Sequence, residues 1–185
     1  MIFRKEKMKL ETYIREICIK IMQIPKVTYY DYLKEDVEKV LSEAEFEKFN
    51  SRLENFRMLL IITCLIDKSS IGKISFSSEE ISRAGFKTIS SLFNENEKVE
   101  NKLSDKFLVL EDEASNYFEY FEINQNTNIK ENVFVYHLCM YYSDKIISEI
   151  DSNVNKSATI AALLNYNKKL ISEYIEKSLK RVKLL

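Results

Sequence analysis

The stretch VFVYHLCMYY, residues 133–142, contains the side chains best suited to chemistry in this sequence. It holds the only histidine, His137, and one of the three cysteines, Cys139. A cysteine beside an imidazole can form an activated thiolate nucleophile. The apolar spacing here predicts a helix, however, and residues two apart on a helix are rotated by about 200° and do not face each other. We therefore expect His137 to be a partly buried, hydrogen-bonded imidazole and Cys139 to be a small buried thiol.

The residue types also exclude several metal and cofactor sites. Di-iron bundle sites need two Glu-x-x-His motifs, and hydrolytic zinc sites commonly use several histidines. Cys18, Cys64 and Cys139 are odd in number and widely spaced, which fits neither a disulfide framework nor a zinc motif. The acidic run 111–113 lacks the spacing of a calcium loop, and no glycine-rich phosphate loop or nucleophile elbow occurs. The sequence therefore predicts no catalytic residues, no metal and no cofactor, and it favours a non-enzymatic function.

Glycine and proline are scarce, with two glycines and one proline in 185 residues. Hairpins and phosphate loops depend on glycine, so this composition favours joined helices over a sandwich, barrel or Rossmann domain. We expect one mainly α domain over 1–185, an irregular helical bundle with N-terminal helices (1–66), a central region (67–125) and a C-terminal helical hairpin (126–185). The longest apolar run, Met58 to Ile66, is shorter than the roughly 20 residues of a membrane span, and no signal peptide is recognisable. A cytoplasmic protein without membrane contact is expected.

Apolar residues recur every three or four positions, as on one face of a helix, along much of the chain. The spacing predicts helices over 10–24, which Pro25 ends, over 30–40 and over 46–66. From Met58 to Ile66 nearly every position is apolar, so this helix should lie at the centre of the fold. Two long helices should finish the chain, one of them an amphipathic helix over 159–183. Their predicted inward stripes are Val133, Tyr136, Met140, Ile147 and Ile150, and Ile160, Leu164, Ile171, Tyr174 and Val182.

The segment 107–123 fits two interpretations. Its apolar residues fit one face of a helix, namely Leu110, Ala114, Tyr117, Phe118 and Phe121. The same residues can also form two strands of a short β-hairpin around an Ala-Ser-Asn turn. The helical period explains more positions than strict alternation does, so a helix is favoured.

The stretch EEISRAGFKTISSLFN, residues 79–94, resembles a helix-turn-helix. Ser77 and Glu80 form a capping box that predicts a helix start, and Gly85 is a typical residue at a helix end. With the possible hairpin, the region is similar to a winged helix. The resemblance implies that the second helix enters the major groove of DNA. The nucleic-acid-binding residues would then be Arg83, Lys87, Thr88, Ser90 and Ser91.

Charge is unevenly distributed along the chain. Residues 1–26 carry a balance of +4, residues 111–151 a balance of −7 and residues 152–185 a balance of +5. Acidic residues follow the second helix of this motif, which disfavours DNA because phosphate contact supplies most non-specific affinity. Our first hypothesis is therefore a regulatory or interaction protein that docks a partner protein on its last helix. The residues expected to do so are Lys168, Lys169, Lys177, Lys180, Arg181 and Lys183.

Two alternatives remain open beside partner docking. One is nucleic-acid binding through 79–94. The other is a small-ligand sensor with a pocket near Tyr136, Tyr141 and Tyr142, because aromatic side chains can line a pocket between helices. A homo-oligomer is compatible with all three hypotheses.

Overall fold

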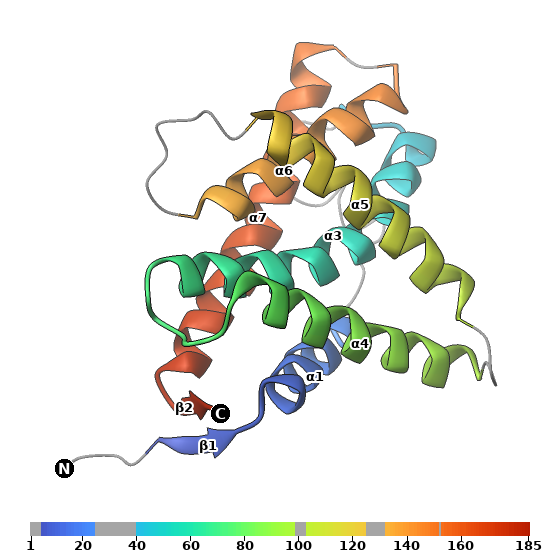
Figure 1. Cartoon of the computed structure of the whole chain (residues 1–185). Coiled ribbons are helices and arrows are strands. Elements are labelled where there is room, and N and C mark those ends of the chain that lie inside the picture. Colours follow the sequence, from blue (N-terminus) through green and yellow to red (C-terminus); the bar gives the residue numbers. More distant parts are fainter. Residues whose placement is uncertain (1–4, 25–39, 99–102, 125–131, 152) are drawn as a thin grey trace.

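The predicted mainly α fold is confirmed. The structure is a computed structural model that describes residues 5–24, 40–98, 103–124, 132–151 and 153–185. The described part contains six helices and a small two-stranded sheet (Figure 1). The predicted helix over 30–40 falls almost entirely outside the described residues. The elements are β1 (Glu6–Met8), α1 (Leu10–Met22), α3 (Glu43–Ser70), α4 (Ser78–Glu97), α5 (Asp105–Asn124), α6 (Val133–Ser148), α7 (Val154–Leu179) and β2 (Val182–Leu184).

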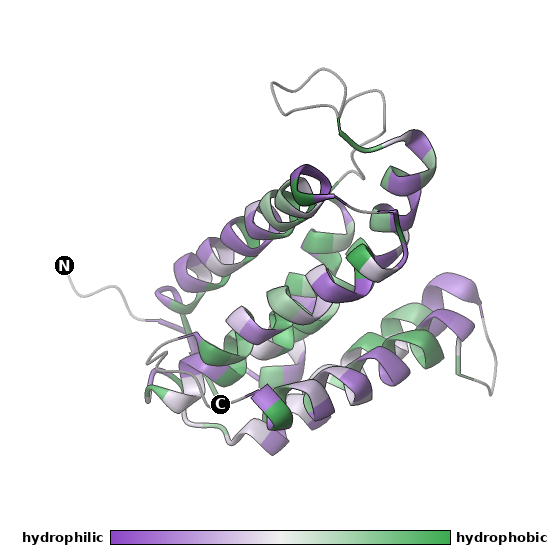
Figure 2. Ribbon diagram, turned by 90° about the horizontal axis from the view of Figure 1, so that it is seen from above, coloured by the Kyte–Doolittle hydropathy of each residue, from purple (hydrophilic) through white to green (hydrophobic). Residues whose placement is uncertain are grey.

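Helix α3 is the centre of the fold, as its sequence predicts. Every residue from Asn55 to Lys68 is buried, which is about 20 Å of helix at 1.5 Å per residue. The helix contacts α1, α4, α5, α6 and α7, which gather around it (Figure 1). The surrounding helices mix apolar and polar residues along their length (Figure 2). A helix that is apolar on all sides needs such enclosure, because no face of it can be left in water.

Helix α4 corrects the helix-turn-helix prediction. The capping box of Ser77 and Glu80 is present and starts a helix where expected. That helix then runs unbroken to Glu97, so no turn occurs at Gly85. A Cβ atom at Gly85 would lie 2.8 Å from both Cδ1 and Cγ1 of Ile62 on α3. Glycine is therefore needed at this position for close packing of α4 on α3, and not to end a helix.

Residues 107–123 are helical, and the alternative of a short β-hairpin is wrong for this segment. They belong to α5, whose buried residues include Phe107, Leu110, Ala114 and Tyr117. These positions follow the period of 3.6 residues that favoured the helix.

The last two helices are present and pack against each other, with two differences from the prediction. The buried face of α6 carries Val135, His137, Leu138, Tyr142 and Ile146, whereas Tyr136 and Met140 of the predicted stripe are exposed. Helix α7 buries Ile160, Leu164 and Ile171 as expected but ends at Leu179. The chain then turns and forms strand β2, so Lys180, Arg181 and Lys183 do not lie on the helix.

A short parallel sheet joins the two ends of the described chain, and the sequence had not predicted it. Glu6, Lys7 and Met8 pair with Val182, Lys183 and Leu184. The Leu185 amide extends the pairing by donating to the Met8 carbonyl over 2.9 Å. The sheet fixes the start of α1 beside the end of α7 (Figure 1).

Asp67, near the end of α3, caps the start of α6. Its two carboxylate oxygens accept from the backbone amides of Phe134 (3.1 Å) and Val135 (3.0 Å). The N-cap residue of α6 itself, Asn132, provides no side-chain hydrogen bond. Burial raises the pKa of Asp67, and these amide bonds oppose the rise. A residue 67 positions earlier in the chain than Phe134 thus provides the hydrogen-bond acceptor for free amides in the first turn of α6.

We expect Gly85→Ala to lower the free energy of unfolding by about 1–2 kcal/mol. Overpacking costs about 1–3 kcal/mol, and the better helix propensity of alanine offsets up to about 1 kcal/mol of it. Denaturant unfolding measures the change. In an Ile62→Ala background the sign should reverse, because the new methyl then fills space. A loss of equal size in both backgrounds would mean that a backbone requirement, rather than Ile62, demands glycine.

We expect Asp67→Ala to destabilise the fold by about 2–3 kcal/mol, since two amides of α6 lose a charged acceptor in a buried setting. Asp67→Asn keeps one side-chain oxygen as acceptor and should cost clearly less. Thermal and denaturant unfolding of the three proteins check this order. Equal stability of wild type and Asp67→Ala would show that the cap contributes nothing.

Candidate functional site

A groove of about 620 Å³ lies between α6 and α7, beside the end of α3. It is within the size range of ligand sites, but most of its lining side chains are polar or charged. The wall formed by α6 and its N-cap contributes a tyrosine, a valine and an asparagine, and α7 contributes most of the charge. The lining residues are Lys68, Asn132, Val135, Tyr136, Asn165, Lys168, Lys169, Ser172, Glu173 and Glu176.

The two acidic residues of the groove are paired. Lys68 Nζ lies 2.7 Å from Glu176 Oε1, and only 8% of the Lys68 side chain is exposed. The hydrogen bond from Lys68 lowers the pKa of Glu176. Glu173 pairs with Lys177 at 3.5 Å, one turn further along α7. Within the described residues, Lys168 and Lys169 have no ion-pair partner, so the groove has a surplus of positive charge.

Exposed apolar side chains lie on the two helices that form the groove. Tyr136, which lines it, is 42% exposed, and Met140 on the next turn of α6 is 40% exposed. Leu170 on α7 is 39% exposed but does not line the groove. Single exposed apolar residues are ordinary on a protein surface, so the apolar lining of the groove itself is Val135 and Tyr136. The arrangement suits a ligand that carries both negative charge and apolar groups.

Among the residues that the structure describes, His137 and the cysteines do not form a nucleophilic arrangement. His137 is 2% exposed and packs edge-on against Phe121 and Tyr136, with ring centroids 5.3 and 5.4 Å away. Desolvation lowers its pKa, which favours the neutral imidazole. Burial raises the pKa of Cys139 to about 11 and that of Cys64 to about 12. These thiols stay protonated at neutral pH, so they lack the thiolate that such catalysis needs.

Glu113 is the centre of a buried polar network that sequence reasoning missed. Its carboxylate accepts from Arg52 (2.8 Å), Asn55 (3.1 Å) and the Tyr142 hydroxyl (2.6 Å). Arg52 also pairs with Glu149 at 2.6 Å. The network joins α3, α5 and α6 and satisfies a carboxylate that is 1% exposed. A signal was available: Glu113 stands three residues after Leu110 and one before Ala114, on the apolar face of α5.

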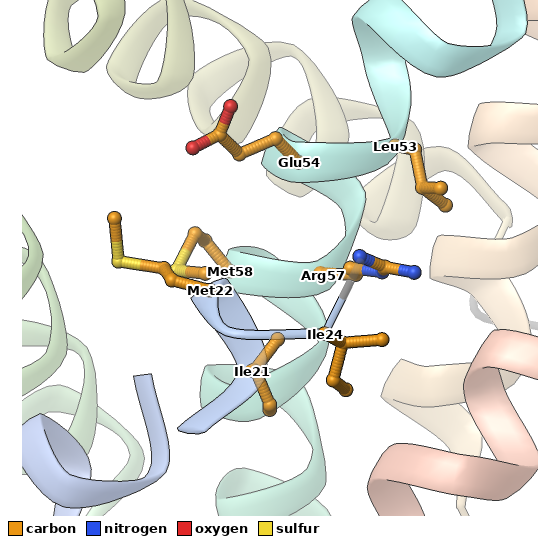
Figure 3. A pocket seen from close by; sticks show the side chains of 7 residues that line it. All are labelled: Ile21, Met22, Ile24, Leu53, Glu54, Arg57 and Met58. Atoms are coloured by element: carbon orange, nitrogen blue, oxygen red, sulfur yellow. The ribbon is translucent and has the colours of Figure 1, made fainter. Parts of the chain in front are cut away.

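The cavity drawn in Figure 3 is too small to hold a ligand. It lies between the end of α1 and the middle of α3 and holds about 40 Å³. Its lining is Ile21, Met22, Ile24, Leu53, Glu54, Arg57 and Met58. Arg57 is engaged elsewhere, because its Nε donates to Asn167 Oδ1 on α7 over 2.9 Å. We interpret the space as a packing gap in the core.

The predicted partner-binding residues are divided by the structure. Lys168 and Lys169 lie together in the α6–α7 groove. Lys177 is exposed on α7 and paired with Glu173. Lys180, Arg181 and Lys183 are exposed beyond the last turn of α7 and do not line the groove.

The predicted nucleic-acid-binding residues are divided as well. Lys87, Thr88 and Ser91 line a second groove, between α4 and α1, together with Lys9, Glu11, Thr12 and Arg15. Arg83 is exposed and pairs with Glu79 on its own helix, and Ser90 is half-buried outside this groove.

The three tyrosines of the predicted ligand pocket do not share a pocket. Tyr136 lines the α6–α7 groove, whereas Tyr142 is fully buried and donates to Glu113. Tyr141 packs edge-on against Tyr142 with a centroid separation of 5.3 Å. Tyr141 and Tyr142 therefore belong to the core between α5 and α6.

Across the ranges that the structure describes, no cluster of three or more histidine, cysteine or acidic side chains is placed to bind a metal ion. None of the helices in these ranges is long and apolar enough to cross a membrane. No protein-family model, no curated protein and no solved structure matches this chain. Its function must therefore be inferred from the geometry of its own surface.

Proposed function

We propose that this chain is an interaction protein that binds a partner protein in the α6–α7 groove. The partner supplies an acidic segment that also carries apolar side chains. The observation that carries the proposal is the pair Lys168 and Lys169, which lie in a groove whose acidic residues are already paired and whose α6 wall presents Tyr136.

Charge complementarity selects the occupant. The ammonium groups of Lys168 and Lys169 attract carboxylates and speed encounter with an acidic partner. Exposed Tyr136 and Met140 offer apolar area to the same segment, and tyrosine is enriched in protein interfaces. A purely ionic ligand would leave these side chains unused, so an amphipathic acidic segment fits better than a small anion.

Buried contacts hold both walls of the groove in place. Lys68 reaches it from buried α3 and holds Glu176 of α7 in place. Asp67, the preceding residue, fixes the start of α6, where Asn132 and Val135 line the groove. Both walls are thus tied to the core, which limits the ordering cost of binding.

To identify the partner, a photo-crosslinking amino acid is placed at Tyr136 in the cell that makes the protein. The matched control places it at Tyr166, which is 66% exposed on α7 but does not line the groove. We expect an acidic protein that crosslinks through position 136 and not through position 166. Crosslinking from both positions to the same proteins, or from neither, would contradict docking in the groove.

With the purified partner, we expect Lys168→Glu/Lys169→Glu to weaken binding at least about tenfold, because two attractive pairs become repulsive. Lys180→Glu/Lys183→Glu makes the same charge change outside the groove and should have a much smaller effect at physiological salt. Titration calorimetry measures both variants. Equal losses in the two variants would mean that net charge, and not the groove, governs binding.

A further inference from the structure

A second groove, between α1 and α4, collects basic and hydroxyl side chains on a part of the surface that the α6–α7 groove does not include. It holds about 390 Å³. Three of its seven lining residues are basic, three carry hydroxyl groups and one is acidic. They are Lys9, Glu11, Thr12 and Arg15 from the start of α1, and Lys87, Thr88 and Ser91 from α4.

The N-terminus of α1 forms part of this groove. The first bond within the helix runs from the Tyr13 amide to the Lys9 carbonyl (3.0 Å), so the amides of residues 10–12 have no acceptor within the helix. The N-cap residue is Lys9, which provides no side-chain hydrogen bond. Such amides and the helix dipole favour an anion at this end of the helix.

Thr88 provides an independent indication of a ligand. It lines the groove from α4, and only 7% of its surface is exposed. Across the part of the chain that the structure describes, its hydroxyl has no hydrogen-bond partner. The hydroxyl oxygen is not among the fully buried polar atoms without a partner, so it opens onto the groove. There it can donate to a ligand with acceptor oxygens.

An internal carboxylate already occupies part of the basic set. Glu95 accepts from Arg15 through Nη1 (3.3 Å) and Nη2 (2.7 Å), and from Ser91 Oγ (3.0 Å). The Arg15 hydrogen bonds lower the pKa of Glu95. Both partners are well exposed, at 40% for Arg15 and 54% for Glu95, so the pair is weak and exchangeable. An incoming anion can take the place of Glu95 on Arg15.

We infer that the α1–α4 groove is a binding site for a phosphate group, carried by a small phosphorylated molecule or by a nucleic-acid backbone. Lys9, Arg15 and Lys87 supply charge, and the hydroxyls of Thr12, Thr88 and Ser91 supply neutral donors. A phosphate has enough acceptor oxygens to use several of these donors together, and arginine matches it with a two-pronged contact. Glu11 and Glu95 are the acidic groups that oppose it.

The test measures binding of pyrophosphate and of a single-stranded DNA 20-mer to the full chain by titration calorimetry at low salt. Glu95→Gln frees Arg15 and Ser91 from their internal acceptor. Because an exposed ion pair is worth less than about 1 kcal/mol, we expect this variant to bind pyrophosphate about two- to fivefold more tightly. Glu97→Gln is the matched control. It removes the same charge from the same helix, and Glu97 has no ion pair with any described residue.

Two further variants test whether binding depends on the side chains of the groove rather than on the net charge of the protein. Thr88→Val keeps the shape and removes the hydroxyl, and Lys87→Gln removes one cation; both should weaken pyrophosphate binding severalfold. If DNA binds more tightly than pyrophosphate, with a steep salt dependence, the source of the phosphate is a nucleic-acid backbone. If it does not, the source is a small phosphorylated molecule. Absence of pyrophosphate and DNA binding to Glu95→Gln, or equal effects of Glu95→Gln and Glu97→Gln, would overturn the inference.

Discussion

The complete enclosure of α3 is the constraint on which the rest of this structure depends. Fourteen consecutive residues, Asn55 to Lys68, are buried, although the segment includes Arg57, Asp67 and Lys68. Apolar burial of this extent supplies the main driving force for folding. The other helices must therefore cover every side of α3. Each charged side chain that is buried with it also needs a hydrogen-bond or ion-pair partner.

The polar residues of α3 meet that demand and set the positions of the neighbouring helices. Arg57 donates to Asn167, Cys64 lies 3.4 Å from Ser172, and Lys68 pairs with Glu176. Successive contact residues along α3 meet successive residues along α7, so the two helices run in the same direction. Together these contacts specify one register between them. Arg52 and Asn55 hold Glu113 of α5 in the same way, and Asp67 fixes the start of α6. Breaking one partner of such a buried pair is costly, because the other is left without compensation.

Both grooves follow from this arrangement. Once α6 and α7 are tied to α3 near Lys68, Tyr136, Lys168 and Lys169 come to line one groove. On the other side, Gly85 lets α4 approach α3 closely, and α1 packs beside it. The start of α1 is held by the pairing of β1 with β2, which brings Lys9 and Arg15 near Lys87. The surface features that we propose as binding sites are thus positioned by the core.

The sequence predicted the structure well where a residue pattern has one physical cause. It was ambiguous where two different interactions produce the same residue pattern. The apolar run of α3 and the Ser77–Glu80 capping box each have a single physical meaning, and both predictions are confirmed. Gly85 could end a helix or admit a neighbouring helix, and only the contact with Ile62 separates these cases. Helix α6 is apolar nearly all round in its first half, so spacing alone could not show that Tyr136 faces outward.

The remaining features depend on contacts between distant residues. Strands β1 and β2 have three residues each, too few for an alternating pattern, and they pair across almost the whole chain. For the same reason the end of α7 at Leu179 was missed, and three of the predicted basic residues were placed on a helix that does not reach them. Lys168 and Lys169 lie on α7, but the groove that they line also requires α6 and Lys68.

Native-state hydrogen exchange tests the central role of α3 most directly. If α3 is enclosed on all sides, the amides from Asn55 to Lys68 can exchange only when the whole fold opens. Their exchange free energies should then equal the global free energy of unfolding measured with denaturant, and should exceed those of α1 and α5. Exchange of the α3 amides at a free energy well below the global value, with α1 or α5 better protected, would contradict a fold organised around this helix.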